Sequence, residues 1–198
     1  RSARILGFEL PYTVDEIEKA KQETLAKSGL ENAYVRAFAW RGSEMMGVSA
    51  QNNKIHVAIA VWHWGDYFAD KMKGIAMTHA QWRRPDPATA PCEAKAAGLY
   101  MICTLSKHAA EKDGFADALM LDWRGHVAEA TGANIFFLRD GALPEELSTF
   151  SECFITGTAA EITPVRSIGE ASYTPGNVTE ALVTDYSDLV HGKITMPA

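Results

Sequence analysis

The sequence predicts a mixed α/β or α+β fold, because strand-like and helix-like segments alternate along the chain. Its composition supports a globular protein: of the 198 residues, 47% are hydrophobic and 22% are charged. A chain of this length can form one large domain or two small ones. Fibrous and disordered classes are therefore excluded.

The first helix is predicted by a capping box at residues 13–16, which have the form T-x-x-E. Apolar residues follow at helical spacing until Gly29 supplies a stop. Residues 33–40 and 54–62 are rich in β-branched and aromatic side chains, so they are predicted to be neighbouring strands. A shorter strand is expected at residues 74–78.

A loop is predicted at residues 83–91, because its prolines remove hydrogen-bond donors and disfavour helix. Residues 96–112 return to a helical pattern, which Gly114 ends. The apolar stripe of this helix consists of Ala97, Met101, Leu105 and Ala109. Strands are expected at residues 118–121 and, after a turn, at residues 127–138.

The local pattern breaks after this strand. Asp140-Gly141 is a strong hairpin signal, yet the next residues begin a proline-initiated helix at Pro144 instead of a second strand. This break predicts that residues of the native polypeptide are absent between Gly141 and Pro144. A short strand at residues 153–155 and a last helix at residues 175–189 complete the predicted elements.

Charge and cysteine content narrow the function classes. The net charge is −6 and no run of basic residues occurs, so binding to nucleic acid is not expected. The three cysteines form no CxxC pair, which favours a reducing, cytoplasmic location. No apolar stretch approaches the ~20 residues of a membrane helix, so no membrane partner is expected. Because the chain begins at Arg1 without a methionine, we expect the natural protein to begin earlier.

Several common catalytic motifs are absent from the sequence. The six histidines form no HExxH pattern or other paired ligand spacing, so no metal site is predicted. No GxGxxG, Walker A or GxSxG sequence occurs. This counts against dinucleotide-binding, nucleotide-hydrolysing and serine-hydrolase functions.

Four residues or segments have side chains that could take part in catalysis or ligand binding, and each could instead have an ordinary structural role. Lys95 has small and apolar neighbours. If its side chain is buried, the neutral amine is favoured over the ammonium, as an imine-forming nucleophile requires. The alternative is an ordinary surface lysine. Glu129 also has small neighbours and could face a protonated pyridine ring, or could be a solvated turn carboxylate. Residues 156–158 could bind an anion through backbone amides, although such turns are common. Arg36 could bind a carboxylate or form a surface ion pair.

Taken together and in order, these segments resemble the branched-chain-amino-acid aminotransferases, class IV enzymes that use pyridoxal 5'-phosphate and have fold type IV. The matching segments are residues 33–36, 45–48, 94–100, 127–136 and 156–165. The resemblance implies a small N-terminal α/β domain at residues 1–67. It also implies a larger, β-barrel-like C-terminal domain with helices at residues 68–198, which binds the cofactor.

The resemblance also implies roles for the cofactor-binding residues. Lys95 would be the catalytic lysine, which forms a Schiff base with pyridoxal 5'-phosphate and moves a proton during the reaction. Tyr100 would hydrogen-bond the phenolic oxygen of the ring, and Glu129 would face its pyridine nitrogen. Gly157 and Thr158 would contact the phosphate.

For the substrate, the resemblance implies that Thr158 and Ala159 receive the α-carboxylate, while Arg36 and Tyr67 bind the distal carboxylate of glutamate. The apolar pocket would be shaped by Tyr34, Trp64, Met46, Gly47 and Val48, the last three from the partner subunit of a homodimer or higher homo-oligomer. The implied reaction transfers the amino group of leucine, isoleucine or valine to 2-oxoglutarate.

The chain also departs from the family pattern. The family's N-terminal portion, with a phosphate-binding arginine, precedes Arg1 and is not in this sequence. A phosphate-binding segment with an Ile-Thr pair, expected between Leu138 and Pro144, is not in it either, and Leu99 stands where many members have asparagine. The alternatives are a D-amino-acid or (R)-amine transaminase, an aminodeoxychorismate lyase, or a non-catalytic scaffold that has lost the cofactor.

Overall fold

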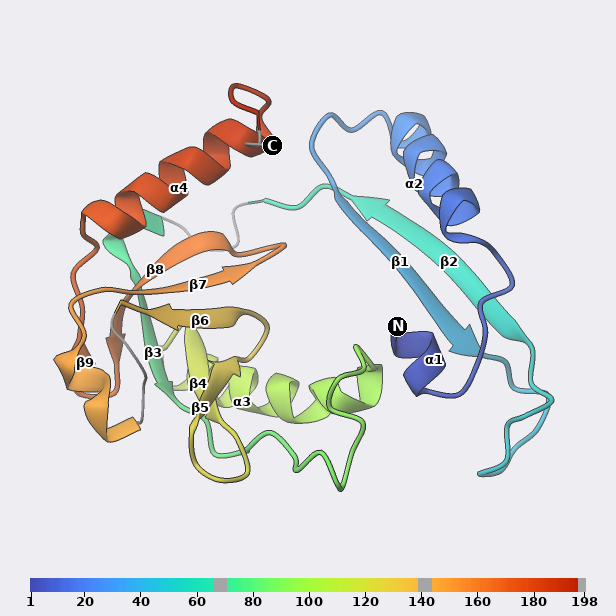
Figure 1. The fold of residues 1–198 in the computed structure, drawn as a ribbon, viewed down its shortest axis with the longest axis horizontal. Coiled ribbons are helices and arrows are strands. Elements are labelled where there is room, and N and C mark those ends of the chain that lie inside the picture. The colour runs from blue at the N-terminus through green and yellow to red at the C-terminus, as the bar shows by residue number, and fades with distance from the viewer. Residues whose placement is uncertain (66–70, 139–143, 196–198) are drawn as a thin grey trace. The chain divides into compact units, whose positions relative to one another are not determined.

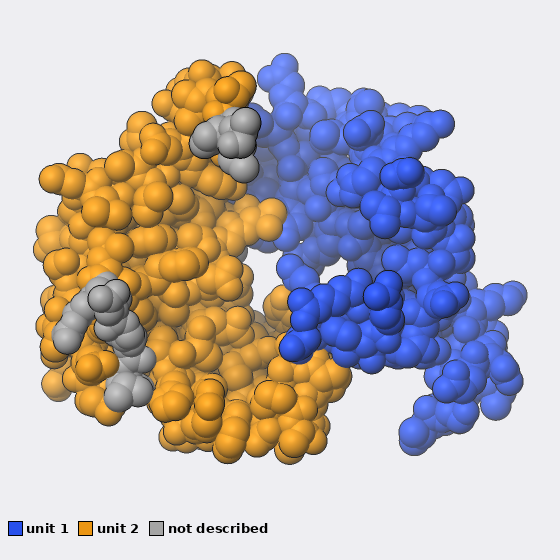
Figure 2. All heavy atoms as spheres, viewed as in Figure 1, with its two compact units in different colours: residues 1–65, 93–95 blue, residues 66–92, 96–198 orange. Residues whose placement is uncertain are grey.

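The computed structural model describes three stretches of the chain, residues 1–65, 71–138 and 144–195. They belong to two compact units, which Figure 2 distinguishes by colour. The first unit consists of residues 1–65 and 93–95, and the second of residues 66–92 and 96–198. The predicted domain boundary at residue 67 and the predicted break after Gly141 both lie outside the described residues.

The first unit contains two helices and a two-stranded antiparallel ribbon. Its elements are α1 (Ser2–Ile5), α2 (Val14–Ser28), β1 (Tyr34–Arg41) and β2 (Ile55–Trp62). The predicted capping box is confirmed, because the Thr13 side chain accepts a hydrogen bond from the Glu16 amide and the Glu16 side chain accepts one from the Thr13 amide. Gly29 ends α2 in the left-handed conformation, with φ of 71°. Helix α2 runs along the ribbon in Figure 1.

The register of the ribbon decides which side chains share a face. Tyr34 lies opposite Trp62, and the pairing continues without a shift to Arg41 opposite Ile55. Because side chains alternate between the faces of a strand, Tyr34, Arg36, Phe38 and Trp40 project on the same side. One face of the ribbon is therefore aromatic and carries one arginine.

The described part of the second unit is built on a seven-stranded sheet. Its strands are β3 (Ile75–His79), β4 (Asp117–Leu121), β5 (Val127–Ala130), β6 (Asn134–Phe137), β7 (Cys153–Gly157), β8 (Glu161–Ile168) and β9 (Ala171–Ser172). The strand order is β5-β4-β3-β8-β7-β6, and β9 pairs with β8. The two end strands, β5 and β6, are joined by a short turn in which the Ala130 amide donates to the Ala133 carbonyl at 2.9 Å. The sheet therefore curls almost into a barrel (Figure 1).

Strand β8 is longer than any segment the sequence pattern predicted there. It contains Pro164, which lacks an amide donor and normally argues against a central strand. The proline lies where β8 changes partners: residues 161–164 pair with β7, whereas residues 165–168 pair with β3. The chain thus passes from one half of the sheet to the other at a residue that cannot continue the hydrogen-bond ladder.

Helices cover the second unit. They are η1 (Lys71–Lys73), η2 (Ala97–Tyr100), α3 (Met101–Lys112), η3 (Pro144–Thr149) and α4 (Asn177–Val190). The expected apolar stripe on the helix at residues 96–112 is wrong, because Met101 and Leu105 are exposed. The buried residues of α3 are Cys103, Ser106 and Ala110. The reason is that α3 packs against β4 through the face of its buried residues, which leaves Met101 and Leu105 on the opposite face. None of the described helices is long and apolar enough to span a membrane.

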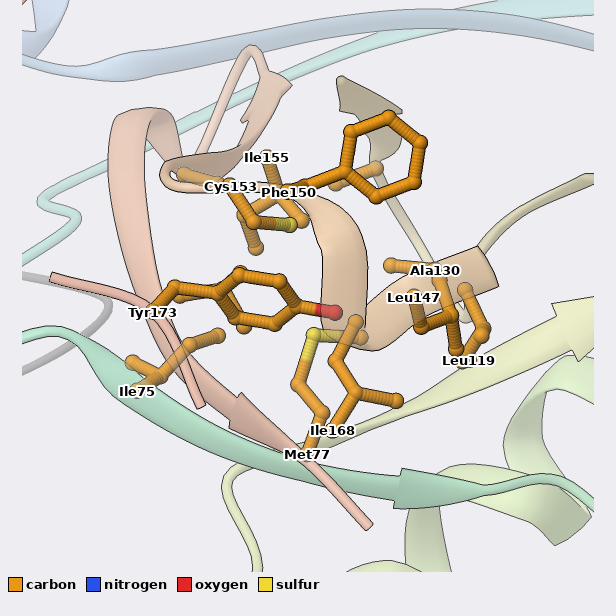
Figure 3. Close-up of a cluster of buried hydrophobic side chains, with 13 residues drawn as sticks. Ile75, Met77, Leu119, Ala130, Leu147, Phe150, Cys153, Ile155, Ile168 and Tyr173 are labelled. Carbon is orange, nitrogen blue, oxygen red and sulfur yellow. The ribbon is translucent and has the colours of Figure 1, made fainter. Parts of the chain in front are cut away.

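The hydrophobic core of the second unit lies between its sheet and η3. Figure 3 shows Met77, Leu119, Ile155 and Ile168 converging from four strands, with Tyr173 reaching across the cluster. The first three of these side chains are completely buried. Dense packing of this kind holds the strands, and therefore the ends that carry the candidate site, in a fixed arrangement.

A buried acidic cap fixes the start of α4. Glu152 Oε2 accepts hydrogen bonds from the Gly176 amide at 3.0 Å, from the Thr179 amide at 3.0 Å and from Thr179 Oγ1 at 2.5 Å. Burial acts to raise the pKa of Glu152, but the hydrogen bonds from Thr179 and Gly176 lower it below its ordinary value. The carboxylate therefore stays charged and satisfies donors that the helix leaves unpaired.

We expect Glu152→Gln to lower the free energy of unfolding by about 1–3 kcal/mol at pH 7, because charged hydrogen bonds to the helix start are weakened. The folded-state pKa is lowered, so this stability is present above the unfolded pKa of about 4.3 and is lost as pH falls through the folded value. Urea unfolding at pH 7 and at pH 3 measures both effects, with Glu170→Gln as the control, because Glu170 is exposed and lies outside any helix. A deficit of equal size at both pH values would contradict a role for the charge.

Candidate active site

A carboxylate and a guanidinium form the centre of the candidate site in the second unit. Glu129 lies on β5 opposite Met120, and its Oε1 is 2.9 Å from Arg84 Nε. The Glu129 and Arg84 side chains are 33% and 19% exposed. Burial raises the pKa of Glu129, and the nearby Arg84 charge opposes that rise only in part. None of the described residues donates a hydrogen bond to Glu129 Oε2, so this oxygen is available to a ligand.

The 156–158 segment lies at the same rim of the barrel as the end of β5. A Cβ added at Gly157 would lie 3.5 Å from the Gly132 carbonyl and 3.5 Å from the Ala133 Cβ. These two residues belong to the turn that follows Glu129 and leads to β6, where Asn134 pairs with Thr156. The predicted acid and the predicted anion-binding segment are thus brought to one edge of the sheet.

The turn after Gly157 is closed by strand pairing on both sides. Thr158, Ala159 and Ala160 connect β7 to β8, and Gly157 pairs with Glu161 across the turn. Glu161 has a φ of +50°, a region that non-glycine residues seldom occupy, and its carboxylate forms an ion pair with Lys71. A turn fixed in this way can present the amides and hydroxyl of its first residues to an anion.

Tyr100 is anchored close to the same guanidinium. It is the last residue of η2 and is 42% exposed. The carbonyl of Leu99, its neighbour, accepts a hydrogen bond from Arg84 Nη1 at 3.2 Å. The segment carrying Tyr100 and the strand carrying Glu129 are therefore tied to one side chain, Arg84, which sequence reasoning does not single out.

Lys95 belongs to the first unit. Its backbone amide donates to Ser2 Oγ at 2.9 Å, and Ala94 beside it is buried. Lys95 itself is exposed, so of the two alternatives that the sequence leaves open for its burial, the structure has the surface lysine. The physical reason is that Ala94 and the main chain, rather than the Lys95 side chain, make the contacts that fix this segment. An exposed amine is open to attack on a carbonyl compound.

The aromatic face of the β1–β2 ribbon gathers several predicted substrate-binding residues. The rings of Tyr34 and Trp64 lie with centroids 4.9 Å apart, and Trp62, which the sequence analysis did not select, lies 4.9 Å from Tyr34. The Arg36 guanidinium stacks 5.2 Å from the Tyr34 ring and donates to the Tyr34 hydroxyl at 3.3 Å. Among the described residues Arg36 has no acidic partner, so its guanidinium can donate hydrogen bonds to the carboxylate of a ligand.

The remaining predicted residues lie on the loop between β1 and β2 or outside the described part. Met46 is 99% exposed and Val48 is fully exposed, with Gly47 between them. Buried Asn53 anchors the loop by donating to the Gly42 carbonyl at 2.5 Å. Tyr67 lies outside the described residues. An anchored loop that offers apolar side chains to solvent is typical of a contact surface.

Comparison with protein families and curated proteins shows consistent similarity. Residues 1–144 match the family model for class IV aminotransferases. The branched-chain-amino-acid aminotransferase of Pseudomonas aeruginosa is 34% identical, over 97% of this chain and 75% of that protein. A probable enzyme of the same name from Rickettsia bellii is 29% identical, over 97% of this chain and 79% of that protein.

Solved structures agree. The branched-chain aminotransferase of Thermoproteus uzoniensis with norvaline superimposes with a TM-score of 0.91, at 30% identity over 98% of this chain and 76% of that chain. The enzyme of Escherichia coli gives 0.87, at 29% identity and the same coverage. A further branched-chain amino acid aminotransferase, complexed with N-(5'-phosphopyridoxyl)-L-glutamate, gives 0.90 at 31% identity. The alignment with the Pseudomonas protein spans 231 positions against 198 residues, so that relative has residues inside the aligned range without a counterpart in this sequence.

Proposed function

This chain belongs to the class IV aminotransferase family, and on that premise we propose that it is a branched-chain-amino-acid aminotransferase. It would transfer the amino group of leucine, isoleucine or valine to 2-oxoglutarate. The observation that carries the proposal is the rim of the second unit, where a half-buried carboxylate with a free oxygen and a fixed Gly-Thr turn lie together. Curated and structural relatives bearing this name support it.

The proposed cofactor is pyridoxal 5'-phosphate, which binds to related enzymes as its pyridoxyl and pyridoxamine derivatives. The donor set of this chain fits such a group: Glu129 Oε2 is available to a protonated ring nitrogen, and the Thr158 turn can bind a phosphate. Lys95 offers an accessible primary amine. When bound, the cofactor supplies a conjugated ring that accepts the negative charge developing at the substrate Cα.

Each side chain then has a defined task. With the cofactor bound, Lys95 Nζ would accept the proton that leaves the substrate Cα and would be the group that moves this proton during the transfer. Glu129 would hold the pyridine nitrogen in its protonated form, and Tyr100 would hydrogen-bond the phenolic oxygen. The amides of Gly157 and Thr158, with the Thr158 hydroxyl, would bind the phosphate, while the turn at Thr158 and Ala159 would receive the α-carboxylate.

The proposed preference for branched-chain amino acids and glutamate follows from the aromatic face of the β1–β2 ribbon and its one arginine. Tyr34 and Trp64 offer apolar area to a branched side chain, and Arg36, with Tyr67, would bind the second carboxylate of glutamate. Burying a leucine side chain contributes about 1.5–3 kcal/mol. That is enough to prefer leucine over alanine but not to separate leucine sharply from isoleucine.

We further propose a homodimer in which the exposed loop of Met46, Gly47 and Val48 completes the apolar pocket of the partner subunit. The exposure of both apolar side chains on an anchored loop supports this. A cytoplasmic location is proposed as well, supported by three cysteines that are all free thiols.

A panel of amino donors with 2-oxoglutarate as acceptor tests the proposed function. We expect turnover of L-leucine, L-isoleucine and L-valine, with kcat/KM for L-alanine lower by at least about tenfold because its side chain buries less apolar area. Glutamate formation, measured by a coupled assay, is the readout. Activity confined to D-alanine would contradict the proposal, and a protein that stays colourless with added cofactor would indicate a non-catalytic scaffold.

A further inference from the structure

Arg84 contacts four separate elements of the second unit, β4, β5, η2 and α3. Its backbone amide donates to the Leu121 carbonyl at the end of β4, at 2.8 Å. Its Nε lies 2.9 Å from Glu129 on β5, and its Nη1 donates to the Leu99 carbonyl at 3.2 Å. The same Nη1 is 3.4 Å from Cys103 Sγ on α3. One largely buried guanidinium thus connects the strand of the acid to the start of the helix that follows Tyr100.

The electrostatics make Arg84 the cation that faces Glu129. Among the described residues, the charged or titratable groups that act on this carboxylate are Arg84, from the segment after β3, and the Cys103 thiol on α3. Burial raises the pKa of Cys103, so near neutral pH its sulfur is a weak neutral acceptor and leaves the Arg84 charge to the carboxylate. Arg84 therefore opposes the rise in the Glu129 pKa that burial causes.

We propose that Arg84 is a positioning residue, which holds Glu129 ionised with Oε2 turned to the ligand while it fixes the Leu99–Tyr100 segment on the other side. This inference rests on the proposed function, because it assigns Glu129 and Tyr100 to opposite ends of one ring. The planar guanidinium suits the task, since its Nε and Nη1 point to different partners at a fixed angle. A lysine in its place has the charge but cannot hold both contacts in that geometry.

A nuclear magnetic resonance titration tests the proposal without cofactor. In protein with ¹³C-labelled glutamate carboxyl groups, the Glu129 signal is identified by its loss in Glu129→Gln. We expect Arg84→Met to move the Glu129 titration midpoint upward by about one pH unit or more, because the neighbouring cation is removed. Arg84→Lys restores part of this shift through its charge. Arg83→Met is the matched control, because Arg83 is exposed and contacts only the Trp123 carbonyl among the described hydrogen bonds.

Bound pyridoxal 5'-phosphate gives a second readout in the absence of any amino acid. We expect Arg84→Met to shift the pH midpoint of its visible absorbance and to weaken its binding several-fold, and Arg84→Lys to recover the midpoint better than the affinity. In a Glu129→Gln background the Arg84→Met shift should disappear. A shift of equal size in that background would mean that Arg84 acts on the cofactor directly, and it would overturn the inference.

The experiments can contradict the positioning role of Arg84 and the proposed aminotransferase function independently of each other. An unchanged Glu129 midpoint in folded Arg84→Met and Arg84→Lys proteins would overturn the positioning role whatever the enzyme does. If wild-type protein fails to transaminate branched-chain substrates, the proposed function fails, while the carboxyl titration still decides whether Arg84 governs Glu129. A merely structural Arg84 would lower stability and leave both midpoints in place.

Discussion

Lys95→Ala is expected to lower kcat for transamination of leucine by at least about a thousandfold. The proposed mechanism uses the Lys95 amine twice, as the nucleophile that holds the cofactor and as the base that moves the substrate proton, and water in its place does neither well. Single-turnover measurement of the colour change with leucine isolates this step from substrate binding. The visible absorbance of bound cofactor should also shift to that of the free aldehyde.

The Lys95 prediction has two controls. Lys27→Ala removes an exposed lysine from the last turn of α2 in the same unit, and we expect it to leave kcat within about twofold. Added methylamine should restore part of the Lys95→Ala rate, because a small amine can enter and move the proton. A Lys95→Ala protein that keeps kcat within tenfold of the wild type would remove Lys95 from the mechanism.

Sequence-local signals predicted the first unit well. The capping box and Gly29 fix the two ends of α2 within a few residues, and each signal involves contacts of near neighbours. The strands at residues 34–41 and 55–62 follow from side-chain composition, and their antiparallel pairing follows from adjacency. Elements determined by local chemistry are accessible from one sequence.

Features determined by distant contacts were not accessible. Pro164 argues locally against a strand, and only the change of partners within β8 makes it acceptable. Residue spacing also does not show which face of α3 turns inward, because packing against β4 selects the face of Cys103, Ser106 and Ala110. Arg84 is one of two adjacent arginines, and the contact that distinguishes it spans the chain to Glu129. Long-range geometry, rather than residue type, decides these cases.

In the candidate site, too, features set by local sequence were predictable and features set by distant contacts were not. Family resemblance selected Tyr34, Arg36 and Trp64, and the alternation of a single strand already places the first two on one face. Resemblance also selected Glu129 and Gly157, but the Gly132–Ala133 turn that brings them to one rim is a tertiary feature. Small neighbours suggested burial for Lys95, whereas in the fold the alanine beside it is buried instead.

Glu129→Gln is expected to reduce kcat by about a hundredfold to ten-thousandfold, with a much smaller change in KM. A neutral amide can still accept a hydrogen bond from Arg84, but it cannot stabilise a proton on the ring nitrogen, so the ring accepts less charge in the transition state. Steady-state kinetics with leucine measure the two constants separately. Glu129→Asp keeps the charge on a shorter side chain and should fall between wild type and Glu129→Gln.

Stability against pH distinguishes this chemical role from a folding defect. The folded-state pKa of Glu129 is raised, so its contribution to stability is full below the unfolded value of about 4.3 and is lost as pH rises through the folded value. Glu129→Gln cannot lose a proton, so cofactor-free variant protein should lack that decline in urea unfolding between pH 4 and pH 7. We expect Glu129→Gln to be folded at pH 7 and yet to have a low kcat. That combination would show that the substitution impairs the reaction and not the folding. Parallel losses of stability and kcat at pH 7 would instead make Glu129 a structural residue.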